Sequence, residues 1–150
     1  MPTVHLILGV LVLGLFVAAS ALGAWRWYRV ESSSAFWLLL RTGQVALVAQ
    51  AALGGVLLAT GHRGYDDLHL VYGLLPLAVS FVAEQLRVAA ADTVLDARGL
   101  DSAKAVGKLP GAEQRSVVVA IVRRELGVMT LAALTITGLV VRAAFVSSAV

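Results

Sequence analysis

The chain has 150 residues, of which 59% are hydrophobic and 14% are charged, and its mean hydropathy is +0.88. A water-soluble domain carries about a quarter charged residues, and a soluble protein this apolar would expose large patches that aggregate. The composition therefore excludes an ordinary soluble domain and predicts a protein that lipid surrounds. The sequence contains no cysteine, which excludes disulfides, iron–sulfur clusters, thiolate zinc sites and cysteine nucleophiles.

Four apolar segments follow one another along the chain, over about residues 4–24, 35–60, 68–83 and 126–146, and we expect helices over about 4–24, 35–60, 68–88 and 113–146. A helix rises about 1.5 Å per residue and a hydrocarbon core is about 30 Å thick, so about 20 residues cross it. None of the segments alternates strictly between apolar and polar residues, as the strands of a membrane barrel do. Helices also satisfy their backbone groups internally, as lipid requires. We therefore expect an all-α, polytopic membrane protein whose residues 1–150 form a single four-transmembrane-helix bundle.

Residues 89–116 have the composition of a water-exposed segment and separate the last two apolar segments. We expect the third helix to continue to about Ala97 and to end at Gly99, because glycine adopts the left-handed conformation that terminates helices. Asp101 is expected to cap a short helix over residues 102–106. Pro110, followed by a glycine, breaks the chain again before the last helix.

Lysine and arginine are distributed unevenly between the two sides of this predicted bundle. Ten lie on the side that holds the first connection and residues 89–116, and two, Arg63 and Arg142, lie on the other. The ten are Arg26, Arg29, Arg41, Arg87, Arg98, Lys104, Lys108, Arg115, Arg123 and Arg124. The positive-inside rule places the richer side in the cytoplasm and both termini outside it, in a multi-pass protein of the cell (plasma) membrane. Contact with anionic membrane lipid, and not with nucleic acid, then accounts for the pI near 9.8.

Small residues recur four positions apart on the first two predicted helices. They are Gly14 and Ala18 on the first helix, and Gly43, Ala51, Gly55 and Ala59 on the second. Small side chains let helix backbones approach closely in lipid, where packing drives association. These stripes predict close helix packing, either inside the bundle or against another membrane subunit.

The third expected helix carries a polar stripe that includes Ser80, Glu84 and Arg87. At 100° per residue these side chains fall within about 80° of one helical face. An ionisable residue on a membrane helix normally faces the bundle interior or marks a function. We expect a structural ion pair between Glu84 and Arg87, Arg41 or Arg123, and we identify no catalytic residue.

Three histidines, His5, His62 and His69, are expected together at the extracytoplasmic end of the bundle, beside Asp66 and Asp67. Imidazole and carboxylate groups suit zinc or copper, and two imidazoles are a ligand set for haem. The spacing matches no metal signature such as HExxH, so the sequence defines no metal site. The histidines are candidate cofactor ligands, and ordinary hydrogen bonding at the membrane surface is the alternative.

The run QAALGGVLLATGHRGYDDLHLVYG, residues 50–73, resembles one half of the haem A synthases, which are four-helix haem proteins of membranes. This resemblance implies that His69 is a haem ligand. The chain lacks that family's glutamate with a following histidine on the first helix, and it lacks the second half of that fold, which argues against haem A synthesis itself. The run LHLVYGLLPLAVSFVAEQLR is similar to small four-helix integral membrane proteins of high-GC bacteria, which implies a structural class and no mechanism.

Sparse chemistry, the absence of soluble domains and small-residue stripes that offer packing surfaces favour a non-catalytic accessory or scaffold subunit of a larger respiratory or transport complex. Its expected partners are membrane lipid and other membrane subunits. The alternative is a small b-type haem protein or metal-binding membrane protein that uses His69 with His5 or His62. A transporter ranks below both, because four helices without a repeat or a pair of ionisable residues at the midplane offer a poor substrate path.

Overall fold

The computed structural model describes residues 2–61 and 67–147, and throughout this part of the chain the regular structure is helical. The helices are α1 (Pro2–Arg29), α2 (Ser34–Ala59), α3 (Asp67–Asp96), α4 (Ala103–Val106) and α5 (Gly111–Ser147). Four of them, α1, α2, α3 and α5, are long and apolar enough to cross a membrane. The predicted all-α class with four such helices is thereby confirmed.

Helix α1 continues beyond the apolar segment that predicted it, through Trp25 to Arg29. It ends where Val30 adopts a φ of 53°, so that the Glu31 N–H donates to the Arg26 carbonyl oxygen at 3.0 Å. Arg26 also forms an ion pair with the Glu31 carboxylate, at 2.7 Å. Hydropathy marks only the apolar part of a helix, whereas its backbone hydrogen bonds end at such a cap.

The other helix ends follow local capping chemistry. Ser33 precedes α2, and its side-chain oxygen accepts a hydrogen bond from the Phe36 N–H at 3.3 Å. Helix α3 ends before Gly99, whose φ of 65° lets the Leu100 N–H reach the Leu95 carbonyl oxygen at 3.0 Å. The expected cap of α4 by Asp101 is wrong, because Ser102 occupies the N-cap position and its side chain donates or accepts no capping hydrogen bond.

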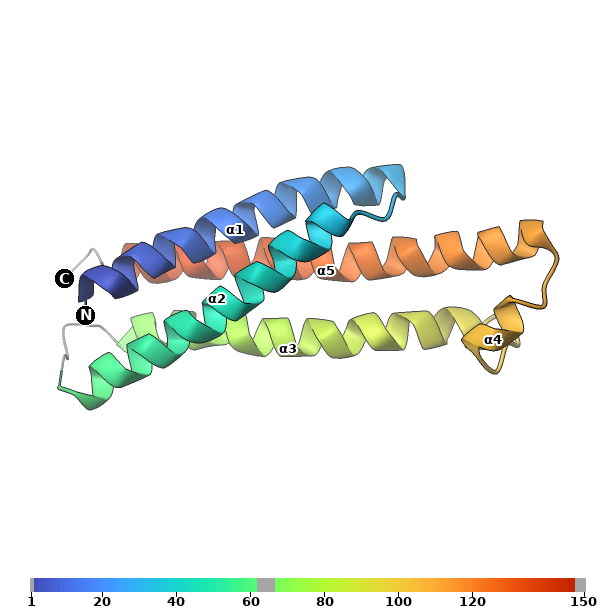
Figure 1. The fold of residues 1–150 in the computed structure, drawn as a ribbon. Helices are drawn as coiled ribbons and strands as arrows, with labels where there is room; N and C mark the ends of the chain where they lie inside the picture. The colour runs from blue at the N-terminus through green and yellow to red at the C-terminus, as the bar shows by residue number, and fades with distance from the viewer. Residues whose placement is uncertain (1, 62–66, 148–150) are drawn as a thin grey trace.

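Helix α5 is the central element of the bundle, because α3 and α1 both pack along it (Figure 1). Helix α2 packs mainly on α1 and runs diagonally from the C-terminal end of α1 towards the N-terminal end of α3. Helices α2 and α3 touch each other much less than the other neighbouring pairs do. Beyond the α1–α2 turn, α3 and α5 continue side by side to α4, and we call this extension the α3–α5 arm.

The apolar core lies where α1, α2 and α5 meet. Phe16, Phe36 and Met129 are fully buried there, together with Leu126 and Ile136. Elsewhere all four long helices direct large apolar side chains outward; examples are Leu6, Val10, Leu38, Val45, Phe81 and Phe145. An exposed apolar surface of this kind is the surface that lipid solvates.

Two glycines allow α1 to approach its neighbours in this core. A Cβ on Gly23 would lie 2.6 Å from both Phe36 Cε2 of α2 and Thr130 Oγ1 of α5. A Cβ on Gly43 of α2 would lie 3.3 Å from Phe16 Cε2 of α1. The core therefore depends on the absence of a side chain at Gly23, where three helices meet.

We expect Gly23→Ala to destabilise the protein by about 1–3 kcal/mol, the usual cost of overpacking a core. Gly14→Ala is the matched control on the same helix, because Gly14 is exposed and nothing lies within 4 Å of an added Cβ. Thermal unfolding in detergent, followed by tryptophan fluorescence, compares the two variants. Equal stability of Gly23→Ala and Gly14→Ala would contradict this account of the core.

Candidate functional site

The first polar cluster is centred on the Glu84 carboxylate of α3. Arg41 of α2 binds both of its oxygens, with a distance of 3.1 Å from Nη2 to Oε2, and Arg87 Nε donates to Oε2 at 3.1 Å. Gln44 Nε2 donates to Glu84 Oε1 at 3.1 Å and to Ser80 Oγ at 3.0 Å. Ser80, Glu84 and Arg87, the predicted polar stripe, thus lie in one network with α2.

The same cluster reaches α5 and an aromatic ring. Arg87 Nη1 lies 3.4 Å from Glu125 Oε1 of α5. The Trp37 ring of α2 lies between two guanidinium groups, with its centroid 5.8 Å from Arg41 Cζ and 5.7 Å from Arg87 Cζ. Such cation–π contacts are favourable, more so where water is excluded.

The geometry of this cluster is that of a brace and not of a proton-transfer site. Its two arginines face two glutamates, and the Glu84 carboxylate accepts hydrogen bonds from three side chains. A fully bonded network in a medium of low dielectric constant rigidifies the structure around it. Because α2 and α3 otherwise touch little, the Arg41–Glu84 and Gln44–Ser80 contacts are their principal connection. Arg123, the third partner considered from the sequence, forms no ion pair with Glu84 and lies exposed on α5.

The second polar cluster brings His5 of α1 and His69 of α3 together at the other end of the bundle. Their ring centroids are 6.2 Å apart and the rings meet edge to face at 61°. His69 Nδ1 donates to the Ala143 carbonyl oxygen of α5 at 3.1 Å, and Gln50 Nε2 of α2 lies 3.2 Å from His5 Nε2. All four long helices therefore contribute to this cluster.

Among the described residues, the histidine cluster offers a cofactor two imidazole ligands. His62, the third candidate ligand, and Asp66 lie outside the described residues. Among residues 2–61 and 67–147, no group of three or more histidine, aspartate and glutamate side chains is arranged to hold a metal ion. The rings already meet edge to face, so a haem between His5 and His69 would require them to move apart.

The predicted packing residues divide into two groups. Gly43 is buried against Phe16, and Ala51 is half-buried. The other four, Gly14, Ala18, Gly55 and Ala59, are exposed, and nothing lies within 4 Å of a Cβ added at Gly14 or Gly55. Within the described residues, Gly14 and Gly55 therefore mark no close approach between two helices.

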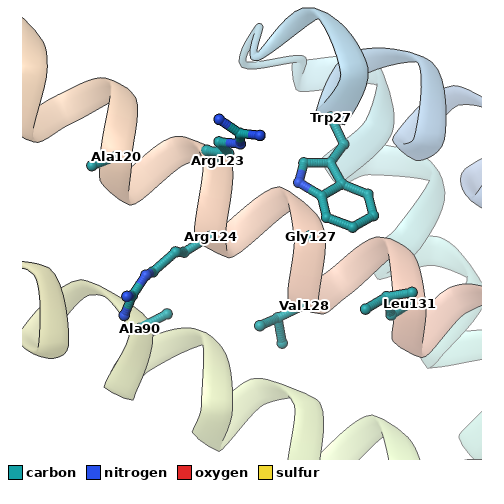
Figure 2. A pocket seen from close by; sticks show the side chains of 8 residues that line it. All are labelled: Trp27, Ala90, Ala120, Arg123, Arg124, Gly127, Val128 and Leu131. Carbon is teal, nitrogen blue, oxygen red and sulfur yellow. The ribbon is translucent and has the colours of Figure 1, made fainter.

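A groove at the C-terminal end of α1, which we call the interfacial groove, was not predicted from the sequence (Figure 2). Its volume is about 560 Å³, and Trp27 of α1 and Ala90 of α3 form its walls. Its floor is one face of α5: Ala120, Arg123, Arg124, Gly127, Val128 and Leu131. A Cβ on Gly127 would lie 2.9 Å from Trp27 Cε2, so this glycine lets the indole lie directly on α5.

A second groove, of about 430 Å³, follows the exposed face of α2 and is almost wholly apolar. It is lined by Gln44, Val45, Val48, Ala49 and Ala52. Neither of the two grooves includes a histidine, so neither extends the histidine cluster into a cofactor pocket.

Comparison with models of protein families, with curated proteins and with solved structures finds no match to this chain. Function must therefore be inferred from the geometry of the chain itself. That geometry comprises the polar cluster around Glu84, the histidine pair, the exposed small-residue stripes and one groove with two arginines.

We expect Glu84→Ala to destabilise the protein by about 1–3 kcal/mol, because it removes the carboxylate to which the Arg41 and Arg87 guanidinium groups both donate. Gln85→Ala is the matched control, since Gln85 is the next residue on α3 and is exposed. Thermal unfolding in detergent measures both. If Glu84→Ala unfolds at the temperature of Gln85→Ala, the cluster does not brace α2 against α3.

Proposed function

We propose that the chain is an integral protein of the cell membrane and acts as a non-catalytic accessory or scaffold subunit of a larger membrane complex. Four helices of sufficient length and apolarity, with large apolar side chains directed outward, support the membrane location. The charged groups of the polar cluster neutralise one another, so they support a structural role better than a catalytic one.

The observation that carries this proposal is the exposure of the small-residue stripes on α1 and α2. Gly14, Ala18, Gly55 and Ala59 have the spacing at which membrane helices pack closely, yet all four are exposed among the described residues, and nothing there lies within 4 Å of a Cβ added at Gly14 or Gly55. A glycine inside an exposed helix lowers its stability relative to alanine. The presence of these exposed small residues is explained if a helix of another subunit packs against them.

Native purification in mild detergent tests the proposal, with co-purifying proteins identified by mass spectrometry. We expect a stoichiometric membrane partner, and we expect Gly55→Leu to weaken its retention by about tenfold or more, because overpacking an interface costs about 1–3 kcal/mol.

Gly138→Leu on α5 is the matched control, since Gly138 is also exposed with nothing within 4 Å of an added Cβ. Absence of any stoichiometric partner would refute the accessory role. Equal loss in the two variants would refute the assignment of the interface to α2.

We propose that both termini are extracytoplasmic and that the α3–α5 arm lies in the cytoplasm, because ten of the twelve basic residues fall on the side of the arm. The sequence has no cysteine, so single cysteines report topology directly. In intact cells, Thr3→Cys should react with an impermeant thiol reagent and Ser102→Cys should react only after lysis. The opposite labelling pattern would show that the termini are cytoplasmic and that the proposed orientation is wrong.

A second candidate function, binding of a haem or metal ion, is favoured by one observation. His5 and His69 are distant in sequence but their rings are in contact, which places two nitrogen ligands on adjoining helices. The contact favours a small ion over haem, because the rings would have to separate to admit a macrocycle.

The visible spectrum and metal content of the purified protein test this second candidate. A Soret band or stoichiometric copper or zinc that disappears in His69→Ala, but persists in Tyr72→Phe one turn further along α3, would establish it. A colourless protein without metal would exclude it and leave the accessory role.

A further inference from the structure

The interfacial groove lies where the bundle changes from four helices to two. Helices α1 and α2 are joined by residues 30–33 at this level, and only the α3–α5 arm continues beyond it (Figure 1). Trp27, in the last turns of α1, forms the wall of the groove. Tryptophan is enriched at membrane–water boundaries. If the chain spans the membrane as proposed above, this groove opens at the level of the lipid head groups.

Two of the excess positive charges on this side of the molecule lie in the groove. Residues 89–116 contain four basic and four acidic residues and are neutral overall. At the level of the membrane surface, Arg26 and Arg29 share Glu31, while Arg41 and Arg87 face Glu84 and Glu125. Within the described residues, Arg123 and Arg124 form no ion pair, and neither do the four basic residues of the neutral segment 89–116. Arg123 and Arg124 are adjacent, and residues 117–124 contain no acidic residue.

The two arginines occupy the aqueous end of an apolar channel. From Arg123 and Arg124 the floor continues through Gly127, Val128 and Leu131, one to two turns deeper along α5. Figure 2 shows Arg123 on the Trp27 side of α5 and Arg124 on the Ala90 side, with the α5 backbone between them. A ligand that matches the groove therefore has an anionic head and an apolar tail.

We propose that the interfacial groove binds one anionic phospholipid, an inference that rests on the proposed membrane location. Arg123 and Arg124 supply the positive charge and the donors that attract its phosphate to the aqueous end of the groove. An acyl chain lies along Val128 and Leu131 against the Trp27 indole. Basic pockets between membrane helices on the cytoplasmic side recognise anionic lipid head groups in the same way. A free phosphate would satisfy the arginines but would leave the apolar floor uncovered.

Native mass spectrometry of the full-length protein in detergent, titrated with phosphatidylglycerol or phosphatidylcholine, tests the proposal. We expect one phosphatidylglycerol to bind in preference to phosphatidylcholine. The double variant Arg123→Gln/Arg124→Gln should bind it about thirtyfold more weakly, from the contribution of each basic residue near an anionic surface. The control Lys108→Gln/Arg115→Gln removes the same charge from the arm, where both residues are exposed, and should bind as the parent does.

A third variant tests whether the groove binds a lipid or a free anion. Leu131→Trp fills the exposed end of the apolar floor and keeps both arginines, so it should weaken phosphatidylglycerol binding while the protein remains folded. Competition by excess inorganic phosphate, together with unchanged binding by Leu131→Trp, would indicate an anion site and overturn the lipid assignment. Equal affinity for the two lipids, or retention by the arginine double variant, would also overturn it.

Membrane extraction distinguishes failure of this inference from failure of the proposed function. If alkaline carbonate releases the protein from the membrane fraction, the integral membrane location is wrong and the lipid site is wrong with it. If the protein stays in the membrane and retains its partner but shows no preference for phosphatidylglycerol, only the lipid site is wrong.

Discussion

The close approach of α1 to α2 and α5 at Gly23 determines much of the remaining structure. Phe36 and Thr130 occupy the space that a side chain at Gly23 would need, so the three helices meet there at backbone distance. One turn further along α1, Trp27 lies on Gly127 of α5 in the same manner. The wall of the interfacial groove is therefore a consequence of the core packing immediately beside it.

Polar contacts complement this apolar core where the helices diverge. Helix α2 has few contacts with α3, and Arg41 and Gln44 join the two through Glu84 and Ser80. Towards the other end of α2, Gln50 meets His5 of α1. In a lipid environment such groups have no water to bond with, so each pair favours one arrangement of the helices over alternatives. The helices pack through apolar contacts, and the polar pairs specify their register.

The sequence predicted the four long helices because apolar length is a local property. It also narrowed the partners of Glu84 to three arginines, but only the three-dimensional arrangement selects Arg41 and Arg87. The small-residue stripes show the limit of such reasoning: Gly14 and Gly23 look alike in sequence, yet one is exposed and the other packs against two helices. The interfacial groove was missed because Trp27 and Gly127 come from opposite ends of the chain, and charge counting does not reveal which arginines lack a partner.

The central position of α5 has a consequence for biogenesis. It is synthesised after α1, α2 and α3, yet α1 and α3 pack mainly against it and Thr130 completes the contact at Gly23. Until α5 is in place, α1 and α2 can form a hairpin that meets α3 through Arg41 and Gln44, but α3 lacks its principal neighbour and Arg87 lacks Glu125. Closure of the bundle therefore waits for α5.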